Sequence, residues 1–190
     1  MGTGGVVGFA YSTISDCSNE GNVSGSETVG GISGAVANSL SKCYNTGSIT
    51  GSKEVGGING NSVSGYGQNI SLCFNTGKIT GNEGVGGISG ELGSSGKKAK
   101  EYKCYNRGNV NTTASTEKIG GIVAHMAKDA NVTDCYYLST IGVSYGVGTI
   151  SSPGVLETQR AGAKATSYDI KTFDEFLTIM NGDMTVLDDE

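Results

Sequence analysis

The chain has 190 residues, 36% of them hydrophobic and 16% charged, which is the size and composition of a single folded domain. Its 33 glycines follow no one-in-three period, so collagen is excluded and repeated tight turns are expected. The net charge of −5, without a long run of lysine or arginine, argues against nucleic acid as a partner. No apolar stretch approaches the roughly 20 residues that direct membrane insertion requires.

Two short motifs alternate along the chain from its first residues onward. One contains Gly-Gly followed by Val or Ile, and it begins at Thr3, Val29, Val55, Val85 and Ile119. The other begins with a cysteine, at Cys17, Cys43, Cys73, Cys104 and Cys135. A period of 26 to 34 residues predicts a repeat protein, with coils at approximately 3–28, 29–54, 55–84, 85–118 and 119–150. Because the first motif starts at once, we expect the chain to be a piece of a longer protein.

The residues between the motifs indicate strands and turns. Short segments rich in Val and Ile alternate with Gly and Asn, and no helical spacing of apolar residues occurs before residue 155. One coil cannot bury its own apolar residues, whereas stacked coils would place Val29 under Val55 and Ile32 under Ile58. We therefore predict an all-β fold over residues 1–150, a parallel β-helix or β-solenoid of about five coils.

Glycine and asparagine recur at fixed places in the predicted coils. The Gly-Gly pair suits either a positive φ or a close approach of another backbone. Asparagine two residues after the cysteine suits a turn, and its amide can bond from coil to coil. Extra residues collect on one side of the stack, in the segments Asn61–Asn69 and Glu91–Tyr102. These inserted segments are candidates for specific contacts, although solvated loops are the simpler interpretation.

The five cysteines are predicted to be a structural ladder of buried, reduced thiols. Metal knuckles need cysteines two to four residues apart, whereas every gap here exceeds 25 residues, so neither a metal nor another cofactor is expected. Five is an odd number, and equivalent positions on adjacent parallel strands make poor disulfide geometry. The ladder comprises Cys17, Cys43, Cys73, Cys104 and Cys135.

Two sets of side chains are candidate contact sites. The residue after each cysteine from the second copy onward is aromatic and, by strand alternation, faces away from the thiols: Tyr44, Phe74, Tyr105 and Tyr136. An exposed stripe of these rings could hold sugar rings, although aromatic ladders also stabilise sheets without a ligand. The second set is a basic loop patch that could meet an anionic polysaccharide or keep a sheet edge soluble: Lys97, Lys98, Lys100 and Lys103.

No catalytic motif is recognisable, so no catalytic residues are assigned. His125 is the only histidine, and no nucleophile or acid accompanies it in a known pattern, so we expect a surface histidine. Hydrolysis of glycosides needs two carboxyls roughly 5 to 9.5 Å apart. The recurring acids before the Gly-Gly pairs are expected to form a solvated turn column instead: Glu27, Glu54, Glu83 and Glu117.

The last 40 residues, 151–190, follow a different pattern. Thr172 and Glu175 form a capping-box signature, and Gly182 is a stop signal. Apolar residues between them have helical spacing, so a short amphipathic helix is predicted near 173–181. We expect it to pack over the last coil and to cover the exposed core and sheet edge, as terminal caps do in repeat proteins.

With these motifs, residues 3–137 resemble the GLUG-motif family of bacterial secreted and cell-surface proteins. The segments that match are Gly31–Gly34, Gly57–Gly60, Gly87–Gly90, Cys43–Gly47 and Cys73–Gly77. Two positions depart from the pattern. Ala124 replaces the last glycine, and Glu101 stands where the other coils have Ile, Leu or Val, which we interpret as a solenoid that loosens toward its cap.

The resemblance implies an extracellular protein, secreted or attached to the cell wall, with any signal and anchor outside this piece. Relatives include IgA-cleaving metallopeptidases that carry such repeats outside their catalytic part. We expect a non-catalytic adhesion or spacer module of a larger bacterial surface protein. A glycan-binding module is the alternative, and a polysaccharide-cleaving enzyme a more distant one. Expected partners are a host or bacterial glycan, a surface protein, and neighbouring domains of the same chain.

Overall fold

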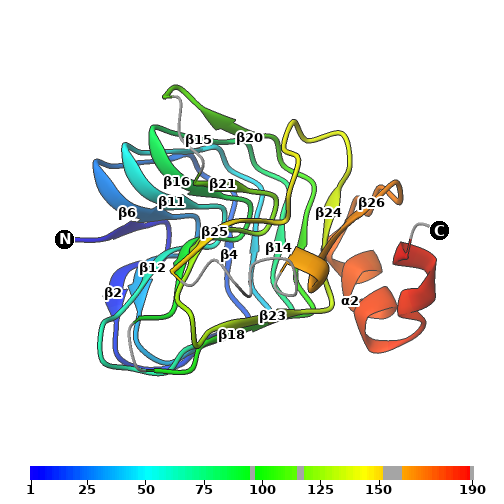
Figure 1. Cartoon of the computed structure of the whole chain (residues 1–190), viewed down its shortest axis with the longest axis horizontal. Coiled ribbons are helices and arrows are strands. Elements are labelled where there is room, and N and C mark those ends of the chain that lie inside the picture. The colour runs from blue at the N-terminus through cyan, green and yellow to red at the C-terminus, as the bar shows by residue number, and fades with distance from the viewer. Residues whose placement is uncertain (95–96, 115–117, 152–159, 189–190) are drawn as a thin grey trace.

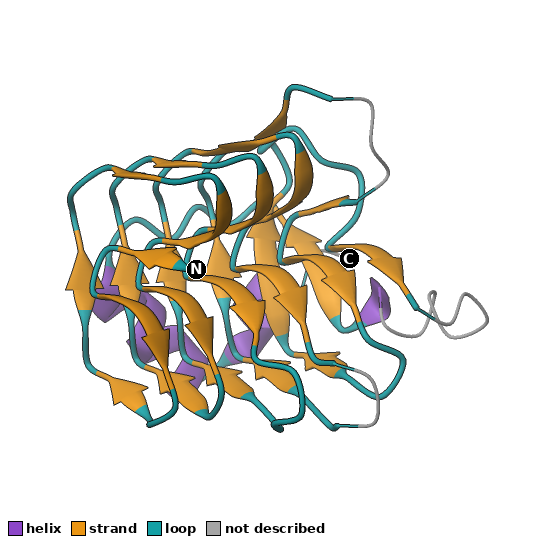
Figure 2. Ribbon diagram, turned by 90° about the vertical axis from the view of Figure 1, so that its left-hand side faces the viewer, coloured by secondary structure: helices purple, strands orange, loops and turns teal. Residues whose placement is uncertain are grey.

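The computed structural model describes residues 1–94, 97–114, 118–151 and 160–188. Within them the chain winds into a solenoid of about five coils, and each coil adds a strand to parallel sheets that we call A to E in chain order. Figure 1 shows the coils nested behind one another, and Figure 2 shows them side by side along the stack. The predicted all-β parallel solenoid is therefore confirmed.

The strands are short because each one spans only a single side of a coil. Sheet A contains β1 (Thr3–Gly4), β6 (Glu27–Gly30), β11 (Lys53–Gly56), β16 (Glu83–Gly86) and β21 (Ile119–Gly120). Sheet B contains β2 (Val7–Ala10), β7 (Ser33–Val36), β12 (Asn59–Ser62), β17 (Ser89–Leu92), β22 (Val123–Met126) and β25 (Val147–Ile150). Sheet C contains β3 (Ile14–Ser15), β8 (Ser39–Ser41), β13 (Asn69–Ser71), β18 (Lys100–Tyr102) and β23 (Asn131–Thr133).

The remaining two sheets complete the circuit. Sheet D contains β4 (Ser18–Asn19), β9 (Tyr44–Asn45), β14 (Phe74–Asn75), β19 (Tyr105–Asn106), β24 (Cys135–Leu138) and β26 (Ala163–Thr166). Sheet E contains β5 (Val23–Ser24), β10 (Ile49–Thr50), β15 (Ile79–Gly81) and β20 (Val110–Thr112). Helix α2 (Phe173–Asn181) and the 3-10 helix η2 (Met184–Leu187) follow. No helix in the described part of the chain is long and apolar enough to cross a membrane.

The register places equivalent residues of successive coils directly beside one another. Val55 pairs with Val29 on one side and with Val85 on the other, as the repeat predicts. These valines, the isoleucines that directly follow the Gly-Gly pairs and four of the five cysteines are fully buried and form one continuous core inside the coils. The coils are therefore held by columns of like residues, each of which removes apolar surface from water.

The Gly-Gly pairs are needed for close approach. None of their glycines has a positive φ; at Gly57 an added Cβ would collide with the Gly87 carbonyl oxygen and lie 2.5 Å from Asn75 Cγ. The predicted asparagine bonds are confirmed, because Asn45 Nδ2 donates to Asn75 Oδ1 at 2.8 Å. Asn75 continues the chain of bonds to Asn106 Oδ1, also at 2.8 Å.

Positive φ occurs instead at the corner between sheets C and D. The residue directly before each cysteine adopts φ of 51° to 55°, although none is glycine: Asp16, Lys42, Leu72, Lys103 and Asp134. This left-handed residue turns the chain so that the cysteine and the residue three positions before it both face the core. Every coil thus has two equivalent inward-facing positions, one on either side of this corner.

The acidic residues before the Gly-Gly pairs do not lie in turns, contrary to expectation. Glu27, Glu54 and Glu83 belong to strands of sheet A, and Glu27 and Glu83 align with Lys53 in one column. Strand pairing continues around residues with positive φ such as Glu54, which is why the turn prediction was wrong. The fourth member, Glu117, lies outside the described residues.

The predicted helix is confirmed as α2, with Thr172 as its N-cap; Glu175 N donates to Thr172 Oγ1 at 3.2 Å. Its position differs from the expectation, because α2 lies beside sheet D and not over the last coil (Figure 1). Strands β25 and β26 instead extend sheets B and D by pairing with β22 and β24. The aromatic side of sheet D offers the apolar surface that α2 needs, which explains this placement.

Candidate functional site

The aromatic column faces outward from sheet D, but the C-terminal segment covers it. Phe74, Tyr105 and Tyr136 are at most 2% exposed, and Tyr44 is partly buried. The ring of Phe176 stacks on Phe74 with centroids 5.3 Å apart. The two tyrosine hydroxyls also have partners, since Tyr105 donates to the Tyr168 carbonyl at 2.7 Å and Tyr136 to the Asp188 carboxylate at 2.9 Å.

The prediction of an exposed sugar platform at Tyr44, Phe74, Tyr105 and Tyr136 is therefore wrong. Strand alternation correctly separates the rings from the thiols, but it does not say whether an outer face meets solvent. Burial of each ring removes a large apolar area from water, about 1.5 to 3 kcal/mol for a side chain of this kind. The column is a second, smaller core.

The four lysines do not form one patch. Lys97 and Lys98 are exposed in the loop that precedes β18, and Lys100 is exposed on the outer face of sheet C. Lys103 occupies the left-handed corner and donates to the Met180 carbonyl at 2.8 Å. A cation at the carboxyl end of a helix is favourable, so Lys103 anchors α2. Of the predicted patch, only Lys97, Lys98 and Lys100 are exposed.

The cysteines form the predicted column. Cys43, Cys73, Cys104 and Cys135 are fully buried, Cys17 is half-buried, and all five are free thiols. Each sulfur donates to the carbonyl two residues before it, at 3.1 to 3.5 Å. Burial raises the pKa of the Cys73 and Cys104 thiols well above the usual value, so these groups are protonated and unreactive in the folded protein.

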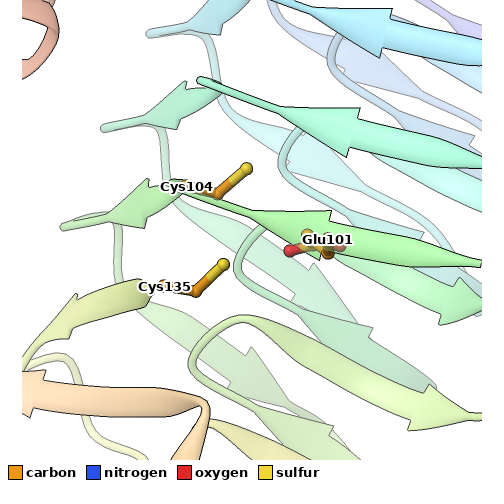
Figure 3. Close-up of side chains that lie close together, drawn as sticks. All are labelled: Glu101, Cys104 and Cys135. Carbon is orange, nitrogen blue, oxygen red and sulfur yellow. The ribbon is translucent and has the colours of Figure 1, made fainter. Parts of the chain in front are cut away.

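Glu101 is the one side chain that breaks the apolar lining of this corner. Its carboxyl group is fully buried, and burial raises the pKa of Glu101 to about 8. Oε2 accepts a hydrogen bond from Ser89 Oγ at 2.6 Å, whereas Oε1 has no partner. Figure 3 shows Glu101 beside Cys104 and Cys135, which point the same way from successive coils. The expected loosening at this position is not observed, because the coil keeps its register with β13 and β23.

The outer face of sheet C forms an uncovered polar groove of about 520 Å³, which we call the sheet C groove. One column of its lining consists of Ser39, Asn69 and Lys100, paired in register across β8, β13 and β18. A parallel column consists of Ser41, Ser71, Tyr102 and Thr133. Hydroxyl, amide and ammonium groups therefore repeat at the spacing of neighbouring strands, about 4.8 Å.

A second, smaller cleft brings together acidic side chains and His125. It is lined in part by Glu54, Glu91 and Lys118 and has a volume of about 30 Å³. Burial, followed by the charge of Glu54, raises the pKa of Glu91, and burial lowers the pKa of His125. His125 is half-buried and its Nδ1 lies 2.8 Å from Thr149 Oγ1, so the expected surface position is only partly correct. The cleft has room for about one water molecule.

Sequence reasoning missed the groove and one exposed aromatic group. Phe9, Tyr11 and Tyr66 are 45%, 63% and 49% exposed. The ring centroid of Tyr11 lies 4.9 Å from that of Phe9 and 5.7 Å from that of Tyr66. Tyr66 comes from the inserted segment Asn61–Asn69, so that segment does contribute a surface feature. Alternation within β13 and β18 could have indicated the groove, since polar residues flank one inward residue in each strand.

The fold defines a repeat protein of the parallel β-solenoid class, in which each coil contributes equivalent residues to the same sheets. Residues 1–24 match the family described as the GLUG motif, and this match supports the GLUG-repeat family for the chain. The match covers a small part of the 190 residues and suggests that the chain is a repeat module of a larger protein. No curated protein and no solved structure matches it.

Proposed function

We propose that the chain is a non-catalytic extracellular adhesion module of a larger bacterial surface protein, and that it binds a glycan in the sheet C groove. The observation that carries the proposal is the polar, uncovered face of sheet C, about 520 Å³ in volume. The repeat supports it, because the register of β8, β13 and β18 aligns polar side chains along the direction of the stack. An extended chain of sugar units presents hydroxyls at regular intervals along such a face.

The groove has the chemistry that sugars require. Serine, threonine and asparagine side chains both donate and accept hydrogen bonds, and sugar hydroxyls do the same. Tyr102, 38% exposed, adds an apolar ring with a polar tip, against which the carbon face of a sugar ring can pack. Lys100 adds a positive charge, which favours an acidic polysaccharide over a neutral one.

The distant alternative, cleavage of a polysaccharide, finds less support in the second cleft. Glu54 and Glu91 do lie together beside His125, and burial raises the pKa of Glu91, as a general acid requires. A volume of about 30 Å³ is far below that of a sugar ring, so a substrate could not reach between them without a rearrangement. We therefore propose binding without catalysis.

The test is a glycan array with host and bacterial polysaccharides, followed by calorimetry on the glycans that bind. We expect Tyr102→Ala to weaken binding by at least about 10-fold, the loss of roughly 1.4 kcal/mol that one good aromatic contact supplies. Tyr66→Ala is the matched control, because Tyr66 is a similarly exposed tyrosine outside the groove.

The outcomes separate the competing functions. If Tyr66→Ala abolishes binding while Tyr102→Ala leaves it intact, the site is the exposed aromatic group and the groove proposal is wrong. If the array is silent for the wild-type protein, glycan adhesion is rejected and the spacer function remains. Release of reducing ends from a bound polysaccharide, lost in Glu91→Gln, would establish the enzymatic alternative instead.

A further inference from the structure

The corner between sheets C and D differs in the fourth coil from every other coil. Elsewhere the cysteine is preceded three positions earlier by an apolar residue, for example Leu40 before Cys43. In the fourth coil Glu101 precedes Cys104, and the left-handed residue Lys103 between them directs both side chains into the core. A carboxyl group thus stands in an apolar column, where a leucine would be accommodated without cost.

Glu101, Cys104 and Cys135 converge in this corner (Figure 3). One carboxylate oxygen and the two sulfur atoms lie within 4.8 Å of one another, and all three residues are 0% exposed. Oε1 of Glu101 is the one buried side-chain nitrogen or oxygen without a hydrogen-bond partner in the described residues. An orphaned buried oxygen normally costs about 1 to 3 kcal/mol, so its presence calls for a partner.

The two sulfurs beside Glu101 are also held less closely than those farther along the column. Cys104 and Cys135 donate to backbone carbonyls at 3.5 and 3.4 Å, whereas Cys17, Cys43 and Cys73 do so at 3.1, 3.2 and 3.2 Å. Because S–H is a weak donor, loss of either contact on rearrangement would cost little.

We propose that Glu101, Cys104 and Cys135 supply three of the four ligands of a Zn²⁺ site inside the solenoid. Two thiolates and one carboxylate are ligands that Zn²⁺ accepts, and the mixture of sulfur and oxygen favours Zn²⁺ over Mg²⁺, which needs oxygen alone, and over Cu⁺, which prefers sulfur. On binding, each thiol gives up a proton to solvent, and Glu101 gives up its own where it carries one. The ion offsets two of the three negative charges of its ligands, which leaves a net charge of −1 at the site.

The surroundings suit such an ion. Ser89 already donates to the second carboxylate oxygen at 2.6 Å, which fixes the orientation of the Glu101 ligand. The sulfurs of a tetrahedral Zn²⁺ site lie about 3.7 Å apart, so the ligand atoms, which are within 4.8 Å of one another, must draw together by at most about 1 Å. The gap of 31 residues between Cys104 and Cys135 hides this pair in the sequence, whereas the solenoid places them on adjacent coils.

The test is metal binding by the full chain, reduced and stripped with a chelator. Because the three ligands are shut off from solvent, the protein is titrated with Co²⁺ both when folded and during refolding from urea. We expect one Co²⁺ per chain, with the absorption of thiolate-to-cobalt charge transfer, and displacement of the cobalt by Zn²⁺. Zn²⁺ should also raise the melting temperature of the wild-type protein.

Variants distinguish this site from adventitious binding by cysteine. Glu101→Leu and Cys135→Ala should each weaken Co²⁺ binding at least about 10-fold. The control is Cys73→Ala, which removes a buried thiol of the same column but none of the three ligands. Glu101→Leu should fold, because Leu40 occupies the equivalent position. The proposal is overturned if refolded wild-type protein takes up no Co²⁺, or if Glu101→Leu binds it as tightly as the wild type.

Discussion

At the scale of single residues, the asparagines two positions after the cysteines hydrogen-bond to one another from coil to coil in the wall of the solenoid. Asn75 donates to the Gly77 carbonyl at 2.9 Å and to Asn106 at 2.8 Å, and it accepts from Asn45. Its burial is complete, so none of these bonds can be replaced by bonds to bulk water. The amide therefore ties three coils together at one point.

We expect Asn75→Ala to lower the free energy of unfolding by about 2 kcal/mol, because it leaves a buried carbonyl and a buried amide with fewer partners. Asn19→Ala is the matched control at the end of the same column. Its amide also bonds to the next coil, but it is partly exposed and water can substitute, so a loss under about 1 kcal/mol is expected. Urea unfolding measures both values, and equal losses would contradict the argument.

Glu101 makes stability depend on pH in the metal-free protein. Burial raises the pKa of Glu101 to about 8, from 4.5, so between these values the folded chain keeps a proton that the unfolded chain has lost. The free energy of unfolding therefore falls as pH rises, with the full stability below about pH 4.5 and the loss complete above about pH 8. The loss amounts to a few kcal/mol.

The measurement is urea unfolding with a chelator from about pH 5 to about pH 9, for the wild type and for Glu101→Leu. Other groups titrate in both proteins, so the difference between the two curves isolates Glu101. We expect Glu101→Leu to be the more stable protein, with an advantage that grows with pH. A difference that stays constant across the range would show that the pKa of Glu101 is not raised in the folded protein.

At the scale of elements, the period of the two motifs was enough to predict the coils and their stacking. Equivalent residues such as Val29 and Val55 meet because every coil repeats the same contacts. The left-handed corner could not be predicted, because Asp, which tolerates a positive φ, occupies it in only two coils, whereas Lys or Leu, which do not signal one, occupy it in the others. The Gly-Gly pair signalled special backbone geometry, but the sequence left open that close approach is the reason.

The main error at this scale was the predicted position of α2. Because α2 covers the aromatic column, the column cannot be the predicted sugar-binding site. Residues 172–182 contain the signals for a helix, yet nothing local says which surface the helix covers. The aromatic column supplies that surface, because Phe173 and Phe176 pack on Tyr44 and Phe74. The departure at Glu101 was visible in the sequence, but its burial and its neighbours needed the fold.

At the scale of the whole molecule, the solenoid has one polar side that is open and one aromatic side that is closed. The C-terminal segment closes the aromatic side by several kinds of contact at once. Arg107 forms a bidentate ion pair with Asp169, and Lys164 and Tyr136 share Asp188. Together with the packing of Phe173 on Tyr44, these contacts reach from the second coil to the fifth, so the segment clamps the stack lengthwise and leaves the sheet C groove free.

Deletion of the segment should therefore do more than expose the end of the stack. We expect a chain that ends after β26, at residue 166, to aggregate, because Phe74, Tyr105 and Tyr136 become a contiguous exposed apolar surface. A chain that ends at residue 150 also loses β26 and uncovers the edge of β24, so it should aggregate faster. Light scattering and the melting temperature rank the three proteins. If both truncated chains stay monomeric and melt at the same temperature as the full chain, neither the cover over the aromatic column nor the pairing of β26 contributes to stability.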